Sequence, residues 1–347
     1  MSKVQSSGNS GEITVGGRPV GAGHPTFLVA EIGGNHGGSP DLAVRLVEAA
    51  AAAGVEAVKF QAYRTAGFLS RLSPYYDELA AEELSFAQLG QLVGQAHRLG
   101  LAAGLTVFEA AGIELALECG ADFLKISSGD LTHHQLLRQA ARAGRPVFLS
   151  TGAAEEAEVT AALKALGGVE AGLVVLQCAA LYPAPLEAVN LAVMARWRSE
   201  GRLVGYSDHT LGLDAAKLAV ALGAAAVEKH FTIDRELPGG DNAISGAPAE
   251  FRELVRWRDE CRTMLGQPLK RPHPQEEAMR PIIRRAIVAG RDLPAGRLLT
   301  ADDLRLQRPP SAVDVLGPDR LEEIIGRRTG KKIPKGAALC WSDLEAV

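Results

Sequence analysis

Short apolar runs alternate with longer amphipathic segments from Thr26 onward. The short runs have the length and β-branched content of buried strands, and the longer segments place apolar residues at the helical period. The predicted strands are Phe27–Ile32, Ala57–Gln61, Ala102–Phe108, Phe123–Ser127, Pro146–Ser150, Leu173–Gln177, Leu203–Tyr206 and Ala226–Phe231. The helical patterns between them include Leu42–Ala53, Ser85–Leu99, Gln135–Ala143, Glu155–Leu166 and Ala215–Leu222. Eight such units over about 250 residues predict a closed (β/α)8 TIM barrel, with a doubly wound open sheet as the alternative.

The segments before and after these eight units have a different pattern of residues. Residues 1–24 read as a polar tail and a hairpin, in which Gly16-Gly17 separates two short apolar runs and would close the bottom of the barrel. The barrel is expected over residues 25–269, and a stiff, Pro-rich linker over residues 270–283. Residues 284–347 combine short apolar runs with turn pairs, which predicts a small, mostly β domain with a weak core of its own.

Composition narrows the class of protein without naming its chemistry. Apolar residues make up 47% of the chain and charged residues 22%, as in ordinary soluble proteins. The net charge of −4 argues against nucleic acid or an anionic membrane as a partner, and no apolar run approaches the roughly 18 residues of a membrane helix. Four cysteines are scattered without a CxxC pair, which indicates reduced thiols in a cytoplasmic protein.

Polar side chains stand at the carboxyl end of nearly every predicted strand, where (β/α)8 barrels carry their active sites. They are Glu31, Lys59 with Gln61, Thr106, Lys125 with Ser127 and Ser128, Ser150 with Thr151, Gln177, Ser207 with Asp208 and His209, and Glu228 with Lys229 and His230. Buried charges are costly unless they are paired or bound to a ligand. A shared anionic ligand and a metal ion would account for them together.

Two histidines at the ends of the seventh and eighth strands are candidate metal ligands. The imidazoles of His209 and His230 could reach one ion, with oxygen donors from Glu228 and Asp241 nearby. Mn²⁺, Mg²⁺, Zn²⁺ and Fe²⁺ all fit such a set, and an ion with open positions could polarise a carbonyl group. A structural role is the alternative for each histidine taken singly.

Two lysines are candidates for binding an anion. Lys59 and Lys125 could hold a phosphate and a carboxylate, helped by hydroxyl groups at neighbouring strand ends. These hydroxyls belong to Thr106, Ser127 or Ser128, Ser150 and Ser207. Helix N-capping is the alternative role for the serines. The loop Gly33–Gly38 could cradle a phosphate, or its glycines could simply permit a tight turn.

At these same residues the sequence resembles the sialic acid synthase family, the phosphoenolpyruvate-dependent synthases of N-acetylneuraminic, legionaminic and pseudaminic acids. The segments that carry the resemblance include Ala30-Glu31-Ile32-Gly33, Ala57-Val58-Lys59-Phe60-Gln61, Lys125-Ile126-Ser127-Ser128-Gly129-Asp130, Gly205-Tyr206-Ser207-Asp208-His209-Thr210 and Glu228-Lys229-His230-Phe231-Thr232. Residues 284–289 and the following Leu304–Pro309 resemble that family's antifreeze-like (SAF) domain.

The resemblance implies condensation of phosphoenolpyruvate with an open-chain sugar aldehyde, such as N-acetylmannosamine, to a nonulosonic acid, with phosphate leaving by C–O cleavage. It also implies a homodimer in which each small domain is swapped onto the partner's active site. His209 and His230 would hold a divalent metal, usually Mn²⁺, with Mg²⁺ or another ion as the alternative. The residues binding phosphoenolpyruvate would be Lys59, Thr106, Lys125, Ser128, Ser150 and Ser207. Those facing the sugar would be Glu31, Tyr182, Glu228, Asp241 and, from the swapped domain, Arg308, and the expected catalytic residues are Glu31, Lys59, Tyr182, Glu228 and Asp241.

Several positions depart from the family's usual pattern. Ala180 stands where Thr or Ser is usual, Gly239-Gly240-Asp241-Asn242 replaces Gly-Pro-Asp-His, and His133 replaces a common Asn. Pro310-Ser311-Ala312-Val313-Asp314 replaces a Gly-rich loop after Arg308. These changes favour the same chemistry on an unusual acceptor, and neutral drift of the loops is the alternative.

Other functions are compatible with the same fold. A catalytically inactive paralogue that binds a sugar or a phosphate is one, although the retained Lys59 and His209 argue against it. A metal-dependent pyruvate aldolase is another, but the hydroxyls around Lys125 favour a phosphate-bearing substrate. A synthase of a shorter ulosonic acid is the third, and the appended C-terminal domain argues for the nonulosonic branch.

Overall fold

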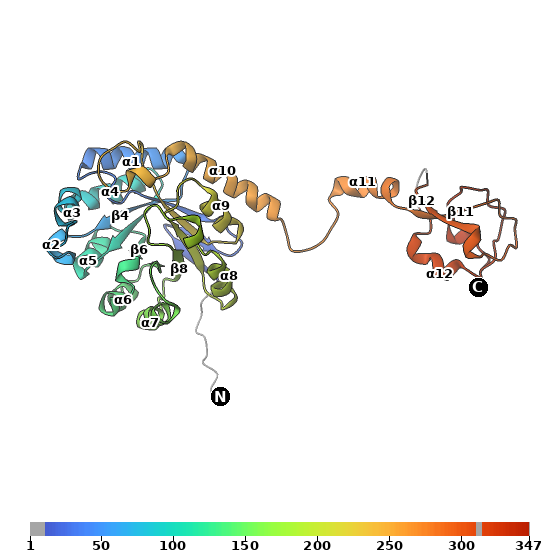
Figure 1. Ribbon diagram of the computed structural model, residues 1–347, viewed down its shortest axis with the longest axis horizontal. Helices are drawn as coiled ribbons and strands as arrows, with labels where there is room; N and C mark the ends of the chain where they lie inside the picture. The colour runs from blue at the N-terminus through green and yellow to red at the C-terminus, as the bar shows by residue number, and fades with distance from the viewer. Residues whose placement is uncertain (1–10, 310–313, 347) are drawn as a thin grey trace, which may run out of the picture. The chain divides into compact units, whose positions relative to one another are not determined.

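The computed structural model describes residues 11–309 and 314–346 (Figure 1). It divides into two compact units, Met1–Gly266 and Gln267–Val347. Among the described residues, no helix combines the length and the apolar content needed to cross a bilayer.

Eight parallel strands of the first unit close into a barrel in the order β10-β3-β4-β5-β6-β7-β8-β9. They are β3 (Phe27–Glu31), β4 (Ala57–Ala62), β5 (Ala102–Val107), β6 (Phe123–Ile126), β7 (Val147–Ser150), β8 (Leu173–Cys178), β9 (Val204–Asp208) and β10 (Ala226–His230). Because β10 pairs with β3, the sheet has no free edge. The predicted (β/α)8 barrel is confirmed, and the open-sheet alternative is wrong.

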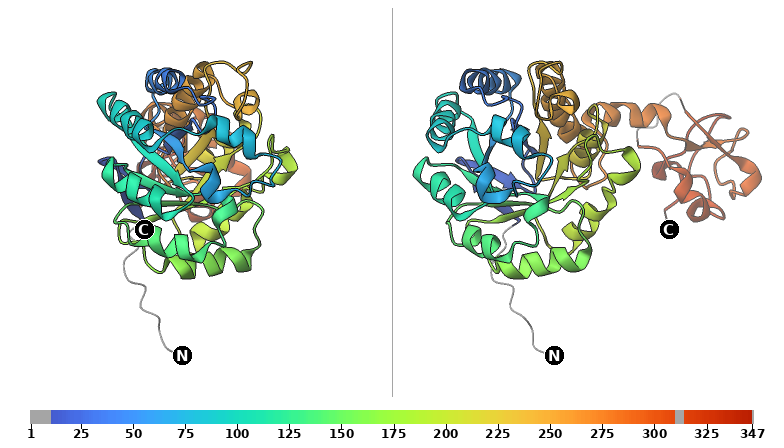
Figure 2. Two further views of the ribbon diagram at one scale, coloured as in Figure 1. Left: turned by 90° about the vertical axis from the view of Figure 1, so that its left-hand side faces the viewer. Right: turned by 60° about the vertical axis from the view of Figure 1, so that its left-hand side comes forward.

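Helices surround the strands on the outside of the barrel (Figure 2). They are α1 (Pro40–Ala53), α4 (Phe86–Arg98), α5 (Ala110–Glu118), α6 (His134–Ala141), α7 (Glu156–Leu166), α8 (Ala192–Ser199), α9 (Asp214–Ala221) and α10 (Pro248–Leu265). Helix α1 shows how local sequence sets their limits, since the Ser39 hydroxyl accepts the Leu42 N–H at its start and Gly54 ends it with φ of 85°. Helices α2 (Thr65–Phe68) and α3 (Tyr76–Glu82) lie instead at the carboxyl ends of the strands, where Glu82 contacts the loop after β10. They are an insertion between β4 and α4 that the sequence pattern does not reveal.

The barrel interior below the polar rim is filled by apolar side chains. Strands β1 (Glu12–Val15) and β2 (Arg18–Gly21) form an antiparallel hairpin. Ile13, Val15 and Val20 of this hairpin belong to one buried cluster with barrel residues such as Phe27 and Phe123. The hairpin therefore packs against the amino-terminal end of the barrel, and it leaves the carboxyl ends of the strands for chemistry.

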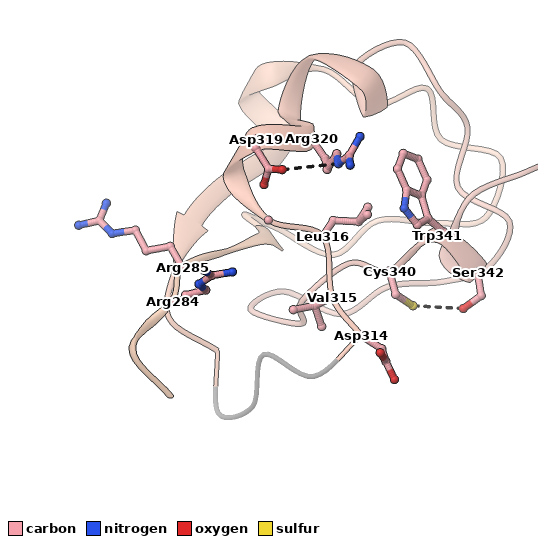
Figure 3. A pocket seen from close by; sticks show the side chains of 11 residues that line it. Arg284, Arg285, Asp314, Val315, Leu316, Asp319, Arg320, Cys340, Trp341 and Ser342 are labelled. Carbon is pink, nitrogen blue, oxygen red and sulfur yellow. Dashed lines mark hydrogen bonds and ion pairs between the residues drawn. The ribbon is translucent and has the colours of Figure 1, made fainter. Parts of the chain in front are cut away.

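The second unit has its own small core. Helix α11 (Pro274–Ile283) lies within the segment expected as a linker, and β11 (Ala286–Ala289) pairs antiparallel with β12 (Leu304–Gln307) before the short helix α12 (Leu321–Ile324). The buried cluster consists of Ile287, Ala289, Leu293, Leu299, Leu304, Leu316, Ile324, Ile333, Leu339 and Leu344. A groove of about 630 Å³ on this unit, drawn in Figure 3, is lined by both acidic and basic side chains, among them Arg284, Arg285, Asp319 and Arg320.

Candidate active site

Alternation along the last two barrel strands decides which side chains meet inside the barrel. On β9 and β10, Ser207 contacts Glu228, with its Oγ donating to Oε1 at 3.0 Å. The next residue on each strand forms a separate contact, in which Lys229 Nζ donates to Asp208 Oδ2 at 2.9 Å. Successive strand residues point to opposite faces of a sheet. The polar residues at these strand ends therefore form two groups with different partners.

Four buried charges meet in the first group. Lys59 Nζ lies 2.6 Å from Glu31 Oε2 and 3.8 Å from Glu228 Oε2, and it donates to Thr106 Oγ1 at 2.6 Å. Lys125 Nζ lies 3.4 Å from Glu228 Oε1. All five side chains belong to residues that are no more than 5% exposed. Two lysines from β4 and β6 thus face two glutamates from β3 and β10 in the mouth of the barrel.

The two glutamates have different proton affinities. Burial raises the pKa of Glu31 to about 7, against the opposing effect of Lys59. Burial also acts to raise the pKa of Glu228, but Lys125 and Lys59 outweigh it and lower that pKa below its ordinary value. Burial lowers the pKa of Lys125. Carboxyl groups whose pKa values are pushed apart are candidates for separate acid and base roles.

The hydroxyl groups at the neighbouring strand ends differ in whether they already have a hydrogen-bond partner. Ser150 Oγ is buried and has no hydrogen-bond partner among the described residues. Ser128 Oγ accepts the Gly152 N–H at 2.9 Å, and its own hydrogen is within reach of the Cys178 sulfur. Thr151 and Ser127 have structural roles instead, because Thr151 Oγ1 donates to the Leu176 carbonyl and Ser127 Oγ donates to Asp130.

The two candidate metal-binding histidines lie side by side. The ring centroids of His209 and His230 are 5.5 Å apart. His209 Nδ1 lies 2.8 Å from the Ala179 carbonyl, which can only accept, so Nδ1 carries the hydrogen and Nε2 presents its lone pair. The Tyr182 ring stacks on His209 with its hydroxyl 3.1 Å from Nε2. His230 Nδ1 is buried without a hydrogen bond and lies 3.4 Å from Asp241 Oδ2.

This pair has the properties that a divalent metal requires. Burial lowers the pKa of both His209 and His230, which keeps the imidazoles neutral, and only the neutral ring binds a metal. The carbonyl bonded to His209 is the usual outer partner of a ligand histidine. Within residues 11–309 and 314–346, no cluster of three or more His, Cys, Asp or Glu side chains is placed to hold an ion. The pair would therefore supply two ligands and leave the remaining positions to substrate and water.

Some residues of the predicted rim do not join this site. Lys229 and Asp208 pair with each other, and Gln177 Nε2 donates to the Val189 carbonyl. His133 caps α6 by accepting the Leu136 N–H. Arg308 is exposed in the second unit, directly after β12. The departure at Pro310–Val313 lies outside the described residues.

One residue beside the site was not singled out in the sequence. Glu82, at the end of α3, is 7% exposed and accepts the Gly240 N–H at 2.6 Å, next to Asp241. A glutamate in the run Ala80-Ala81-Glu82-Glu83 has the pattern of a solvated helix face. Nothing local in the sequence distinguishes Glu82 from the exposed glutamates around it.

Comparison with known proteins agrees with this geometry. The NeuB family matches residues 46–270, and the SAF domain matches residues 284–345. The N,N'-diacetyllegionaminic acid synthase of Legionella pneumophila is 35% identical over 349 residues, covering 95% of this chain and 97% of that protein. The N-acetylneuraminate-9-phosphate synthase of Homo sapiens is 31% identical over 306 residues, covering 84% of this chain and 85% of that protein.

Solved structures give the same result. The N-acetylneuraminic acid synthetase of Leptospira borgpetersenii superposes with a TM-score of 0.74 at 33% identity, covering 77% of this chain and 94% of that chain. A putative spore coat polysaccharide biosynthesis protein E of Chromobacterium violaceum gives 0.79 at 26% identity, covering 93% and 100%. The chain therefore belongs to the NeuB family, and it carries a SAF domain over residues 284–345.

Proposed function

We propose that this sugar-acid synthase condenses phosphoenolpyruvate with an open-chain sugar aldehyde, giving a nonulosonic acid and phosphate. The observation that carries the proposal is the pair of buried lysines, Lys59 and Lys125, whose ion-pair partners among the described residues are Glu31 and Glu228. In the same part of the chain, the buried Ser150 hydroxyl at the end of β7 has no hydrogen-bond partner. Relatives named as legionaminic, neuraminic and pseudaminic acid synthases support a sialic-acid-like product.

Phosphoenolpyruvate would bind where positive charge and free hydroxyl hydrogens meet. Lys59 and Lys125 would exchange part of their contact with Glu31 and Glu228 for the phosphate and carboxylate of the substrate. Ser150 has a hydroxyl hydrogen to donate, and Ser128 would exchange its weak hydrogen bond to the Cys178 sulfur for one to the substrate. Charge-assisted hydrogen bonds of this kind are the strong ones in a buried site.

The two glutamates would divide the proton transfers. C3 of the enolpyruvate attacks the aldehyde carbon, and the former carbonyl oxygen takes up a proton. Glu31, whose raised pKa keeps it partly protonated near neutral pH, suits that donation. A water then adds at C2 and loses a proton, for which the ionised Glu228 is the better acceptor. As the C2–O bond breaks, phosphate leaves with the bridging oxygen and takes up the proton of the new C2 hydroxyl, which becomes the keto oxygen of the product.

The histidine pair would sit on the sugar side of the site. A divalent metal held by His209 and His230, Mn²⁺ by the family resemblance, would polarise the aldehyde carbonyl. Tyr182, stacked on His209, and Asp241, beside His230, would face the sugar. Ala180 and Asn242 lie in the loops that carry these two residues and differ from the usual family pattern, so an acceptor other than N-acetylmannosamine fits this chain.

The direct test is phosphate release from phosphoenolpyruvate with Mn²⁺ and a panel of aldoses that includes N-acetylmannosamine. We expect EDTA-sensitive release with at least one aldose and a product three carbons longer. Label in the bridging oxygen of phosphoenolpyruvate should appear in phosphate. Turnover of pyruvate in place of phosphoenolpyruvate would favour the aldolase, and tight phosphoenolpyruvate binding without release would favour the inactive paralogue.

A homodimer with exchanged SAF domains is part of the proposal. Residues 267–347 carry 15 Lys and Arg against 11 Asp and Glu, while residues 1–266 carry 22 against 30, so the two units have opposite net charge. Opposite charge favours docking of one unit on the other. Arg308 would then reach the sugar bound in the partner's barrel.

Mixing two inactive variants tests this arrangement. A His209→Ala chain keeps its Arg308, and an Arg308→Ala chain keeps its barrel site. If the SAF domain acts on the partner, coexpression restores one complete site in each mixed dimer and returns activity that neither variant has alone. A sedimentation profile of a monomer, or no recovery on coexpression, would contradict the exchanged dimer.

A further inference from the structure

We propose that Glu82 is a positioning residue for the sugar side of the site, because it fixes the loop that presents Asp241 to His230. This inference rests on the proposed function, in which Asp241 faces the sugar. Glu82 itself lies on α3, outside the eight strand ends that carry the other site residues.

The Glu82 carboxylate lies between two loops of the barrel. Its Oε1 accepts the Gly240 N–H at 2.6 Å. A Cβ placed on Gly34 would lie 2.2 Å from Oε2, and one on Gly239 would lie 3.1 Å from Oε1. The carboxylate therefore fills the space between the loop after β3 and the loop after β10. A carboxylate this buried is costly unless its contacts compensate for lost water, so its position is not incidental.

The loop that Glu82 contacts turns at two consecutive glycines. Gly239 and Gly240 have φ of 75° and 55°, and neither has a side chain to pack. The loop is anchored further along, where Thr232 Oγ1 donates to Asn242 Oδ1 at 2.6 Å and Ser245 Oγ donates to the Asp241 carbonyl at 2.7 Å. Two side chains hold the Gly239–Gly240 peptide: Glu82 accepts its N–H, and Asn242 Nδ2 donates to its carbonyl at 2.9 Å. Glu82 is the one of the two that lies outside the loop.

The position of Asp241 depends on this peptide. Asp241 Oδ2 lies 3.4 Å from His230 Nδ1, so a shift of the Gly239–Gly240 peptide, one residue before Asp241, would move the carboxylate relative to the histidine pair. A proline at position 240 would have no N–H to donate to Glu82. Glycine also fits the close packing here, because a Cβ at position 240 would lie 2.7 Å from the Gly34 carbonyl carbon. Lys59, Lys125 and Ser150 lie on β4, β6 and β7. Among the described residues the partners of the two lysines are Thr106, Glu31 and Glu228, none of which is in this loop, so phosphoenolpyruvate binding should not depend on Glu82.

Three variants of the full-length protein test the role. Glu82→Ala removes the acceptor, Glu82→Gln removes the charge but keeps an acceptor oxygen, and Asp77→Ala removes an exposed carboxylate from the same helix. We expect Glu82→Ala to raise the KM for the accepted aldose about tenfold, since a lost hydrogen bond to a charged group has at least that effect. The KM for phosphoenolpyruvate should stay within about twofold, and Glu82→Gln should restore most of the loss.

Amide hydrogen exchange tests the contact without reference to activity. In Glu82→Ala the Gly240 amide should exchange at least about tenfold faster than in the unaltered protein, and in Glu82→Gln and Asp77→Ala it should not. Unchanged exchange in Glu82→Ala would overturn the inference. Faster exchange with an unchanged aldose KM, or an equal rise in both KM values, would overturn it too. If the unaltered protein releases no phosphate with any aldose, the proposed function fails, while the exchange data still decide whether Glu82 holds the loop.

Discussion

Lys229 and Asp208 form a fully buried ion pair that joins the two strands carrying the histidines. Lys229 Nζ donates to Asp208 Oδ2 at 2.9 Å and to the Thr210 carbonyl at 2.6 Å. The other Asp208 oxygen accepts the N–H and hydroxyl of Thr210. Since Asp208 precedes His209 and Lys229 precedes His230, this pair fixes the backbone from which both imidazoles project.

Breaking the pair should destabilise the barrel strongly. Lys229→Met leaves Asp208 buried and unpaired, which costs about 3–5 kcal/mol in the free energy of unfolding. Urea unfolding measures the loss. The matched control is Lys217→Ala, which breaks the more exposed pair with Glu253 and should cost less than about 1 kcal/mol. Equal losses in the two variants would contradict the structural role assigned to Lys229.

Ser150 and Thr151 are neighbours with opposite expected effects. Ser150→Ala removes a hydroxyl that has no partner among the described residues, so the free energy of unfolding should not fall. Its KM for phosphoenolpyruvate should rise about 10- to 100-fold, as expected when a hydrogen bond to an anion is lost. Thr151→Val removes the donor to the Leu176 carbonyl and should cost about 1 kcal/mol in stability with an unchanged KM. An unchanged KM in Ser150→Ala would remove this serine from the phosphoenolpyruvate site.

The barrel could be predicted from sequence because its strands are buried on both faces and read as apolar runs, as at β10 and β3. The insertion of α2 and α3 could not. Helix α3 is held by contacts with distant residues, such as the Tyr63 hydroxyl donating to the Leu79 carbonyl. The hydrophobic pattern of a seven-residue helix carries no information about a contact with another segment. The place of Glu82 beside the site could therefore not be predicted from sequence.

Part of the site could be predicted from the apolar runs that mark the strands. Glu31, Lys59 and Lys125 could be listed as candidates because each stands near the carboxyl end of an apolar run. The sequence could not say which strand-end residues share a face. A shift of one residue reverses the direction of a side chain, and only the pairing of β9 with β10 shows that Glu228 meets Ser207 whereas Lys229 meets Asp208.

His36 should make the protein sensitive to mild acid. It is 5% exposed, its Nδ1 accepts the Gly38 N–H at 3.1 Å, and burial lowers its pKa to about 4. Between about pH 6.5 and pH 4 the unfolded chain binds a proton at His36 and the native protein does not, so the free energy of unfolding falls as the pH falls. The full loss is on the order of 3 kcal/mol.

Comparison with His36→Asn isolates this effect, because Asn keeps an acceptor for the Gly38 N–H but does not titrate. The difference in unfolding free energy between the two proteins should change across pH 4 to 6.5 and stay constant above it. Glu31, with its raised pKa, makes stability fall as the pH rises from its ordinary value to about 7, and this contribution cancels in the difference. A difference that does not vary with pH would show that His36 titrates normally.

Removing the metal should separate the two halves of the reaction. EDTA should abolish phosphate release but leave phosphoenolpyruvate binding measurable by calorimetry. The reason is that Lys59 and Lys125 are paired with Glu31 and Glu228 and not with the histidines. His230→Ala should weaken Mn²⁺ binding by at least about 100-fold, because the loss of a ligand should have at least the largest effect that outer-sphere changes cause. Titration of the protein into Mn²⁺ measures the affinity, since the EPR signal of the free ion falls as the ion binds. His36→Asn, which alters a buried histidine outside the pair, should leave Mn²⁺ affinity unchanged. Equal Mn²⁺ affinities in His230→Ala and the unaltered protein would show that the histidine pair is not the metal site. The two neutral imidazoles at this rim would then need another explanation.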